Sequence, residues 1–342
     1  MSEIRSLFYV EPGQVRWRSV PTPVLAADTD ALVRPIVSST CDLDRRIVTG
    51  RTPMPGPFAL GHEAVGEVVA VGDAAGAAGL RPGDRVVIPW HLSCGTCVHC
   101  LARRPANCSA TPPLAAYGVP LGGPHGGLFD ELVRVPYAAT SLVPLPDGLD
   151  PAAAVSCSDN LTDAYQGVRD AMAEHPDARV LIVGGTASLG LFAVMFAVAL
   201  GAGEVTYIDK DPEAVALATR LGAAHVICGR HPERVEGVFE ATVDASGSAA
   251  GLACALRSTA PGGTCSIRSV YFTDMPFPYF DMYAAGITVC TGLAQITPNV
   301  PVVLDLLRTG AVQPGPVYSA PLRFDDAPAV LLDPPRKPVF VR

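Results

Sequence analysis

The feature that most restricts the fold of this 342-residue chain is a regular alternation between residues 177 and 292. An apolar run at 179–183 (R-V-L-I-V) is followed by a glycine-rich turn, a helical segment from about Leu189, and a second apolar run at 204–209 (E-V-T-Y-I-D). Strand, turn, helix and strand in this order and length form a βαβ unit, whose strands are parallel. The sequence therefore predicts a doubly wound α/β domain over this segment.

Further elements are expected at intervals that suit the same sheet. They are a helix at 212–221 and strands at 225–228, 241–244 and 264–268. After Pro298 the sequence predicts one more helix at 300–309, and then a β-like, proline-rich tail that ends V-F-V-R.

The chain up to about residue 150 has a different pattern. Short β-rich runs, such as 64–71 (A-V-G-E-V-V-A-V) and 84–88 (D-R-V-V-I), are separated by glycine and proline turns. This pattern is typical of an antiparallel β domain. A length of roughly 150 residues per domain also favours two domains.

Composition excludes several functional classes. Hydrophobic residues make up 49% and charged residues 17% of the chain, but no apolar run reaches the roughly 18 residues that span a bilayer. The N-terminus has an early acid and no basic head, unlike a signal peptide. A net charge of −8 without a basic block argues against nucleic acid or anionic membrane as a partner. We expect a cytoplasmic protein whose ten cysteines are thiols and metal ligands rather than disulfides.

Four cysteines are spaced as C-x2-C-x2-C-x7-C: Cys94, Cys97, Cys100 and Cys108. Such steps can converge four thiolates on a tetrahedral Zn²⁺. Redox chemistry or scattered thiols is the weaker alternative, and a nucleic-acid zinc ribbon would have two separated cysteine pairs and basic surroundings. Because protein ligands would fill all four positions, the sequence predicts a structural zinc ion.

The turn G-G-T-A-S-L-G between the first strand and helix of the α/β segment is suited to a pyrophosphate. Gly184 and Gly190 fit the outer glycines of G-x-G-x-x-G, with one extra residue and Thr186 near the middle glycine. A tight turn without a ligand is the alternative. The next strand ends in Asp209, whose carboxylate can bind ribose hydroxyls and repel a 2′-phosphate, which favours NAD over NADP. The neighbouring Lys210 could tolerate that phosphate.

Three features occur together: Cys41 followed by G-H-E at 61–63, the four-cysteine lobe, and the nucleotide turn. With L-G-H-E-A-V-G-E-V-V-A-V-G (60–72), R-P-G-D-R-V (81–86) and G-G-L-F-D-E-L-V-R-V-P (126–136), the chain resembles the zinc-dependent medium-chain dehydrogenase/reductase family over nearly its whole length.

The resemblance implies a GroES-like β-rich catalytic domain and a Rossmann domain. The catalytic domain is expected at 1–155 plus 293–342, with the structural zinc lobe at 90–110, and the NAD(P)-binding domain at 156–292. Relatives are commonly dimers or tetramers, so a homodimer or homotetramer is expected, acting on a small alcohol or aldehyde substrate.

The resemblance also implies a second, catalytic zinc ion bound by a cysteine, a histidine and a third ligand. Cys41 and His62 match the first two. In C-S-D-N-L-T-D-A-Y (157–165), Asp159 matches the third, and Cys157 is the less favoured competitor. One open position would let the zinc act as a Lewis acid on an alcohol or carbonyl while a hydride passes to or from nicotinamide.

Several neighbours have roles implied by the same match. Asp44 corresponds to the acid that hydrogen-bonds the zinc-bound histidine, although it could also be a helix N-cap. Glu63 corresponds to a glutamate behind the zinc, where it could coordinate transiently or satisfy a buried arginine. Trp90 and Leu43 are placed in the substrate pocket, and a packed core aromatic is the alternative for Trp90.

For the nucleotide, Leu189 would lie behind the nicotinamide ring, and backbone near residues 269–270 and 291–293 would hold the carboxamide. The implied cofactor-binding residues are Gly184, Gly185, Thr186, Ser188, Leu189, Gly190, Asp209, Lys210, Ser269, Val270 and Leu293.

The sequence departs from the family at the proton relay. Many zinc alcohol dehydrogenases have Ser or Thr two residues after the zinc cysteine and a histidine three residues further on. Here these positions are Leu43 and Arg46, neither of which can pass a proton in the usual way. One hypothesis routes protons through Asp163. Another is a reductase of a conjugated aldehyde, enal or iminium-type metabolite.

A non-catalytic nucleotide-binding pseudoenzyme is the alternative from a different class, and the intact zinc ligands argue against it. A zinc-free quinone reductase is disfavoured because it would need neither the four-cysteine lobe nor Cys41.

Overall fold

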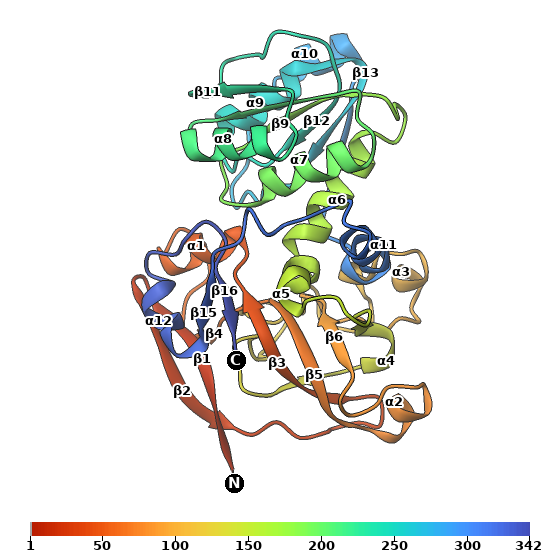
Figure 1. Cartoon of the computed structure of the whole chain (residues 1–342), viewed down its shortest axis with the longest axis vertical. Coiled ribbons are helices and arrows are strands. Elements are labelled where there is room, and N and C mark those ends of the chain that lie inside the picture. Colours follow the sequence, from red (N-terminus) through yellow and green to blue (C-terminus); the bar gives the residue numbers. More distant parts are fainter. Residues whose placement is uncertain (1) are drawn as a thin grey trace. The chain divides into compact units, whose positions relative to one another are not determined.

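The computed structural model describes residues 2–342, which divide into two compact units (Figure 1). The β-rich unit contains the chain up to Thr162, Leu293–Thr309 and Tyr318–Arg342, and the α/β unit contains Asp163–Gly292 and Gly310–Val317. The first boundary therefore lies later than residue 155, inside helix α6 (Asn160–Ala171). A change in composition marks a linker but cannot locate a boundary within a continuous helix.

Two sheets form the β-rich unit. The smaller has the order β2-β1-β4, and the larger has the order β15-β16-β3-β5-β6-β8, with β7 also paired to β3. The pairs are antiparallel except β15 with β16, and in the larger sheet the longest pairing joins β3 and β5. The strands are β1 (Glu3–Glu11), β2 (Gln14–Pro21), β3 (Ala31–Ser39), β4 (Phe58–Ala59), β5 (Glu63–Val71), β6 (Arg85–Ile88), β7 (Val133–Val135), β8 (Val143–Pro144), β15 (Pro321–Arg323) and β16 (Val339–Val341).

Short helices connect these strands. They are α1 (Asp42–Val48), α2 (Asp73–Ala77), α3 (Val98–Leu101), α4 (Ala138–Ser141), α5 (Pro151–Ala154) and α12 (Ala327–Val330), with 3-10 turns η1 (Pro105–Asn107), η2 (Val155–Ser158) and η3 (Phe324–Asp326). Inward-facing residues of β3, β5 and β6 form one core with Leu128 and Tyr117. Alternation of buried and exposed positions along these strands fixes which face packs inward.

The α/β unit has one six-stranded parallel sheet in the order β11-β10-β9-β12-β13-β14. The strands are β9 (Arg179–Val183), β10 (Glu204–Asp209), β11 (His225–Cys228), β12 (Phe239–Asp244), β13 (Thr259–Ile267) and β14 (Thr288–Thr291). Helices α7 (Leu189–Ala199), α8 (Pro212–Arg220), α9 (Ala249–Ser258) and α10 (Tyr279–Ala285) pack against it (Figure 1). The predicted doubly wound fold is confirmed.

Helix α11 (Ile296–Arg308) belongs to the β-rich unit and begins four residues before the predicted start at 300. The sequence predicts a break at Pro298. In the structure Pro298 lies in the first turn, where a backbone N–H has no intrahelical partner and proline is tolerated. Pro301 follows inside the helix.

None of the helices formed by residues 2–342 is long and apolar enough to cross a membrane. All ten cysteines of this part of the chain are free thiols.

Candidate metal and nucleotide sites

Three side chains from separate elements meet in the β-rich unit. Cys41 is the N-cap of α1, His62 directly precedes β5, and Asp159 follows η2. Their ligand atoms lie within 4.8 Å of one another, and His62 Nε2 is 3.5 Å from Asp159 Oδ2. Nitrogen and oxygen ligands of a tetrahedral zinc, at about 2.0–2.2 Å from it, would be separated by about 3.3–3.6 Å. The donor set and its spacing therefore fit a zinc ion.

The charge of this cluster also favours a cation. Burial, together with the carboxylates of Asp159, Asp44 and Glu63, raises the pKa of the Cys41 thiol well above its ordinary value. Burial alone would lower the pKa of His62, but Asp44 and Asp159 outweigh it and raise the pKa to about 9. Bound Zn²⁺ would neutralise this excess of negative groups, stabilising the thiolate and the neutral imidazole.

Asp44 lies on the other side of the imidazole. Its Oδ1 is 3.8 Å from His62 Nδ1, and both atoms are buried without a hydrogen-bond partner among the described residues 2–342. Oδ2 of Asp44 accepts a hydrogen bond of 2.9 Å from the Cys41 backbone N–H. The expectation that Asp44 could be the N-cap is thus wrong, because Cys41 holds that position and Asp44 completes a capping box three residues later.

Glu63 is fully buried and tightly held. It accepts a hydrogen bond of 2.8 Å from Lys337 Nζ, one of 2.8 Å from Ser156 Oγ, and one of 3.1 Å from the Asn160 backbone N–H. The buried cation behind it is therefore a lysine rather than the expected arginine. Lys337 Nζ also donates to the carbonyl of Thr40, the residue before the candidate ligand Cys41, at 2.6 Å.

Cys157, the competing ligand, is fully buried outside the three-residue cluster. Burial raises the pKa of its thiol well above its usual range, so it is a neutral thiol.

The four cysteines of the lobe also converge, with their sulfur atoms within 4.8 Å of one another. Cys97 Sγ and Cys108 Sγ are 3.9 Å apart, and four zinc–sulfur bonds of about 2.3 Å would separate sulfur atoms by about 3.8 Å. Backbone N–H groups of Thr96 and Cys97 point at Cys94 Sγ at 3.4 and 3.3 Å. Hydrogen bonds from Ser109 and from the Cys100 backbone lower the pKa of Cys97 to about 5, which favours the thiolate that zinc requires.

The glycine turn lies at the carboxyl end of β9 in the α/β unit. A Cβ on Gly184 would lie 2.3 Å from Tyr207 Oη and 2.7 Å from Asp209 Oδ2. Gly185 has φ of +147°, and its Cβ would lie 2.5 Å from the Ser246 carbonyl oxygen. Only glycine fits this backbone, which precedes the buried N-cap Ser188 of α7. This arrangement suits close approach of a pyrophosphate.

Asp209 is buried at the end of β10, where its carboxylate accepts hydrogen bonds from Tyr207 Oη at 2.7 Å and the Asp211 backbone N–H at 3.0 Å. Each oxygen keeps capacity for another donor, such as a ribose hydroxyl. Lys210 is exposed. Among the remaining implied cofactor residues, Thr186 lies in the turn, and its buried Oγ1 has no hydrogen-bond partner among residues 2–342. Leu189 and Gly190 begin α7, and Ser269, after β13, accepts a hydrogen bond from the Gly247 N–H. Val270 is half exposed, and Leu293 belongs to the β-rich unit.

Trp90 is half-buried in the β-rich unit, and its Nε1 donates to the Ala294 carbonyl at 3.3 Å. Leu43 is also half-buried, in the first turn of α1. Asp163, in the α/β unit, forms an ion pair with the buried Arg268. Its role in proton transfer stays a prediction.

Sequence reasoning missed three residues that the structure places at these sites. Lys337 lies behind Glu63, Arg268 pairs with Asp163, and His231 contacts the Gly184 carbonyl at 2.8 Å through Nε2. The only signal for Lys337 was a pair of basic residues, Arg336 and Lys337, shortly before the apolar run V-F-V.

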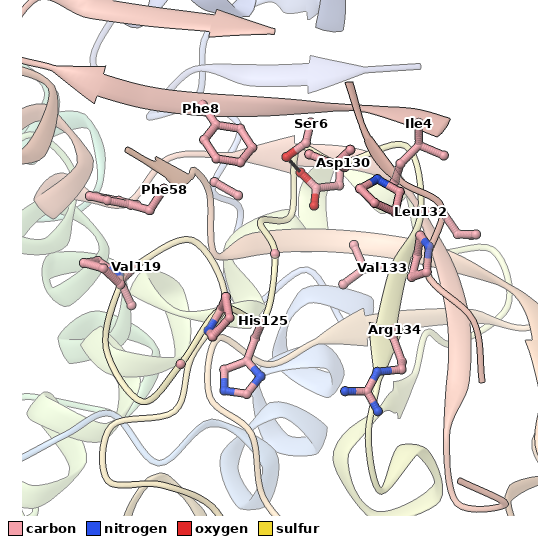
Figure 2. A pocket seen from close by; sticks show the side chains of 18 of the residues that line it. Ile4, Ser6, Phe8, Phe58, Val119, His125, Asp130, Leu132, Val133 and Arg134 are labelled. Atoms are coloured by element: carbon pink, nitrogen blue, oxygen red, sulfur yellow. Dashed lines mark hydrogen bonds between the residues drawn. The ribbon is translucent and has the colours of Figure 1, made fainter. Parts of the chain in front are cut away.

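A cavity of about 480 Å³ lies elsewhere in the β-rich unit, and Figure 2 shows the residues around it. Aromatic and aliphatic side chains of β1 and β4 line it together with His125, Arg134 and the buried Asp130. The Asp130 carboxylate accepts hydrogen bonds from Ser6 Oγ and the Gly127 N–H. The predicted zinc and nucleotide ligands are not among the residues that line this cavity.

Comparison with known proteins agrees with this description. Residues 27–147 match the alcohol dehydrogenase GroES-like domain, and residues 188–308 match the zinc-binding dehydrogenase domain. A medium chain reductase/dehydrogenase of Acremonium is 30% identical over 82% of this chain and 99% of its own.

Solved structures show the same architecture. The alcohol dehydrogenase TADH from Thermus sp. ATN1 is 31% identical, with a TM-score of 0.86, and 98% of this chain and 99% of that chain are covered. A protein of Sinorhizobium meliloti 1021 assigned as a zinc-binding dehydrogenase, bound to NADP, is 26% identical, with a TM-score of 0.84 over the whole of both chains. Taken with the two converged ligand clusters and the glycine turn, these similarities show that the chain belongs to the zinc-dependent medium-chain dehydrogenase/reductase family.

Proposed function

We propose that this zinc-type oxidoreductase transfers a hydride between NAD(H) and a small alcohol or carbonyl substrate. The observation that carries the proposal is the convergence of Cys41, His62 and Asp159 at spacings suited to a zinc ion with one position left for substrate. When bound there, zinc supplies Lewis-acid catalysis that lowers the pKa of a substrate hydroxyl or polarises a carbonyl.

The chain's own residues set up this chemistry. Asp44 Oδ1 lies 3.8 Å from His62 Nδ1, and its negative charge favours the tautomer protonated at Nδ1, in which Nε2 keeps its lone pair. Lys337 neutralises Glu63, which leaves the buried zinc ligands supported by a charge-balanced pair. In the oxidative direction the substrate loses a hydride to nicotinamide and a proton to solvent.

Asp209 supports NAD as the nucleotide, because a buried carboxylate at the end of β10 would repel a 2′-phosphate. Two observations favour NADP instead: the NADP bound to the Sinorhizobium protein and the exposed Lys210. An Asp209→Ser variant should gain activity with NADPH relative to NADH. An unchanged ratio of kcat/KM for the two nucleotides would remove Asp209 from this proposal.

The proton route needs its own test, since Leu43 and Arg46 stand where the usual relay would be. Asp163 is the proposed substitute. Its carboxylate pairs with the guanidinium of the buried Arg268. If Asp163 passes protons, Asp163→Asn lowers kcat and shifts its pH profile; an unchanged profile would end this hypothesis.

A second candidate within the enzyme class is a reductase of a conjugated aldehyde, enal or iminium-type metabolite. The missing relay at Leu43 and Arg46 favours it. A panel of alcohols, aldehydes and enals, followed by NADH absorbance with NAD and NADP in parallel, separates the candidates. Oxidation of simple alcohols at rates comparable to the reverse reaction would exclude the reductase, and activity on none of them would favour the non-catalytic alternative.

Exposed aromatic residues support a homodimer or homotetramer. On α10, Tyr279, Phe280 and Tyr283 are 72%, 79% and 71% exposed, and β14 ends the adjoining sheet. Phe280→Asp should reduce the mass found by light scattering if this surface joins two copies. The free thiols suit a reducing compartment, and a cytoplasmic location is part of the proposal.

A further inference from the structure

His91 is a buried histidine without a hydrogen-bond partner. His91 is 2% exposed, and its Nδ1 and Nε2 both lack a hydrogen-bond partner among residues 2–342. Buried polar groups are nearly always hydrogen-bonded, because leaving one unsatisfied costs about 1–3 kcal/mol. An imidazole with two free nitrogens is therefore expected to meet a polar group that the protein itself does not provide.

The backbone places His91 beside the candidate zinc centre. The Trp90 N–H donates to the carbonyl of Ser158, the residue before the proposed ligand Asp159, at 3.2 Å. His91 pairs with Ala116 in an antiparallel bridge, and the next residue, Leu92, packs into the core of the β-rich unit. Since side chains alternate along extended backbone, His91 points away from that core.

The neighbours of His91 set its hydrogen-bonding capacity. Burial lowers its pKa to about 3 although Asp159 opposes the shift, so the imidazole is neutral. A neutral imidazole has one donor and one acceptor. A carboxylate offers no donor and would be repelled by Asp159, whereas a hydroxyl group offers both a donor and an acceptor.

We infer that His91 hydrogen-bonds a second hydroxyl group of the substrate, so that the enzyme prefers alcohols carrying a neighbouring hydroxyl over simple alcohols. The inference rests on the proposed oxidoreductase function and deepens it by naming the substrate class. The edge-to-face contact between His91 and Trp90, whose ring centroids are 5.1 Å apart, places the imidazole against the aromatic residue expected to line the substrate pocket.

The kinetic test compares propylene glycol with propanol and isopropanol. His91→Leu should lower kcat/KM for propylene glycol by about ten- to hundredfold and change it less than about threefold for the simple alcohols. His91→Gln keeps a donor and an acceptor and should restore part of the glycol activity. Ser93→Ala is the matched control, because Ser93 Oγ, two residues further along the chain, is also buried and without a hydrogen-bond partner among residues 2–342.

A binding measurement gives a readout that does not depend on turnover. The chain has two tryptophans, so Trp17→Phe leaves Trp90, next to His91, as the sole tryptophan reporter. In the zinc-loaded protein with this substitution, propylene glycol should perturb Trp90 fluorescence at lower concentration than propanol, and His91→Leu should remove the difference.

The outcomes separate the two proposals. Oxidation of none of the alcohols overturns the proposed function. The role of His91 is overturned if all the alcohols are oxidised and His91→Leu lowers kcat/KM equally for propylene glycol and propanol. It is also overturned if the fluorescence titration shows equal binding, or no binding, of these two alcohols. Either result is expected if an ordered water satisfies the imidazole.

Discussion

The imidazole of His62 lies between two carboxylates, so the contribution of each to the candidate zinc centre can be tested by a separate substitution. Nε2 faces the Asp159 carboxylate at 3.5 Å, and Nδ1 faces Asp44 at 3.8 Å. The negative charge of Asp44 favours the tautomer protonated at Nδ1, which leaves Nε2 free to bind a metal. Loss of Asp44 should therefore weaken the centre without removing a ligand.

We expect Asp44→Asn to lower the affinity of the catalytic zinc by about 10- to 100-fold, because the amide is a poorer acceptor for the Nδ1 proton. Competition with a chromogenic chelator measures this affinity. The four-cysteine zinc should be released at the same chelator concentration as in the wild-type protein, which provides the internal control. If the variant releases its catalytic zinc at the same chelator concentration as the wild-type protein, the proposed role of Asp44 is refuted.

Cys41→Ser should reduce the zinc content from two ions per chain to one and abolish activity, because a hydroxyl is a poor zinc ligand. Cys157→Ser is the matched control. Its thiol is fully buried and lies outside the ligand cluster, so metal content should stay at two. Elemental analysis after gel filtration measures the zinc content of both variants. Loss of one zinc ion from the Cys157 variant would make Cys157, rather than Cys41, the zinc ligand.

Residues of this centre differ in how far the sequence could predict them. Cys41, His62 and Asp159 stand in recognisable motifs and offer donors that zinc prefers, so their convergence was predictable. Lys337 was not, because its partner Glu63 lies 274 positions away and local sequence does not say which buried charges will pair. His91 was missed since an unsatisfied imidazole is visible only once its surroundings are known.

Among the secondary-structure elements, the turn after β9 has no room for a side chain at one of its positions. Gly185 has a positive φ and no room for a Cβ beside the Ser246 carbonyl. Any side chain there must move either the turn or the loop after β12. Both surround the proposed pyrophosphate position, so nucleotide binding should be more sensitive to this change than folding is.

Gly185→Ala is expected to weaken NADH binding by about tenfold or more while zinc content and circular dichroism stay unchanged. NADH fluorescence titration measures the Kd. Gly315→Ala serves as the control, because a Cβ at Gly315 meets nothing within 4 Å and its φ is not positive. An unaltered Kd for the Gly185 variant would show that the turn adapts and does not bind the pyrophosphate.

Of the parallel strands, β9 and β10 were predicted closely because strands buried on both faces are continuous apolar runs. β9 and β10 begin and end where the sequence placed them. β13 begins five residues before its predicted start at 264, and β14 was not predicted. The start of α11 was missed because proline was read as a break although its first turn tolerates one. The pairing of β16 with β3 depends on contacts between segments about three hundred residues apart, which periodicity cannot reveal.

At the scale of the whole molecule, the Asp130 cavity gives the stability of the protein a dependence on pH. Burial raises the pKa of Asp130 from 3.8 to about 7, against hydrogen bonds from Ser6 and Gly127. The folded protein then binds this proton more tightly than the unfolded chain. Its contribution to stability is full below about pH 4 and is lost as the pH rises toward about 7.

Asp130→Asn keeps a donor and an acceptor but does not titrate. Relative to wild type, the variant should therefore gain on the order of 2–4 kcal/mol of unfolding free energy between about pH 4 and about pH 8. Urea midpoints at several pH values measure the gain. Asp325→Asn is the control, because Arg5 lowers the pKa of Asp325 and keeps it ionised over this range. A constant difference between the Asp130 variant and wild type would disprove the titration.

The pairing of β16 with β3, and the contact of Lys337 with Thr40 and Glu63, also determine the order in which the chain can fold during synthesis. The ribosome makes Cys41 and His62 early, but the strand and the ammonium group that complete their surroundings emerge about three hundred residues later. The parallel sheet of residues 179–291 can form before then, since all its strands have already been made. A nascent chain arrested before Lys337 should therefore protect its nucleotide-binding sheet from protease while its early cysteine remains open to thiol reagents.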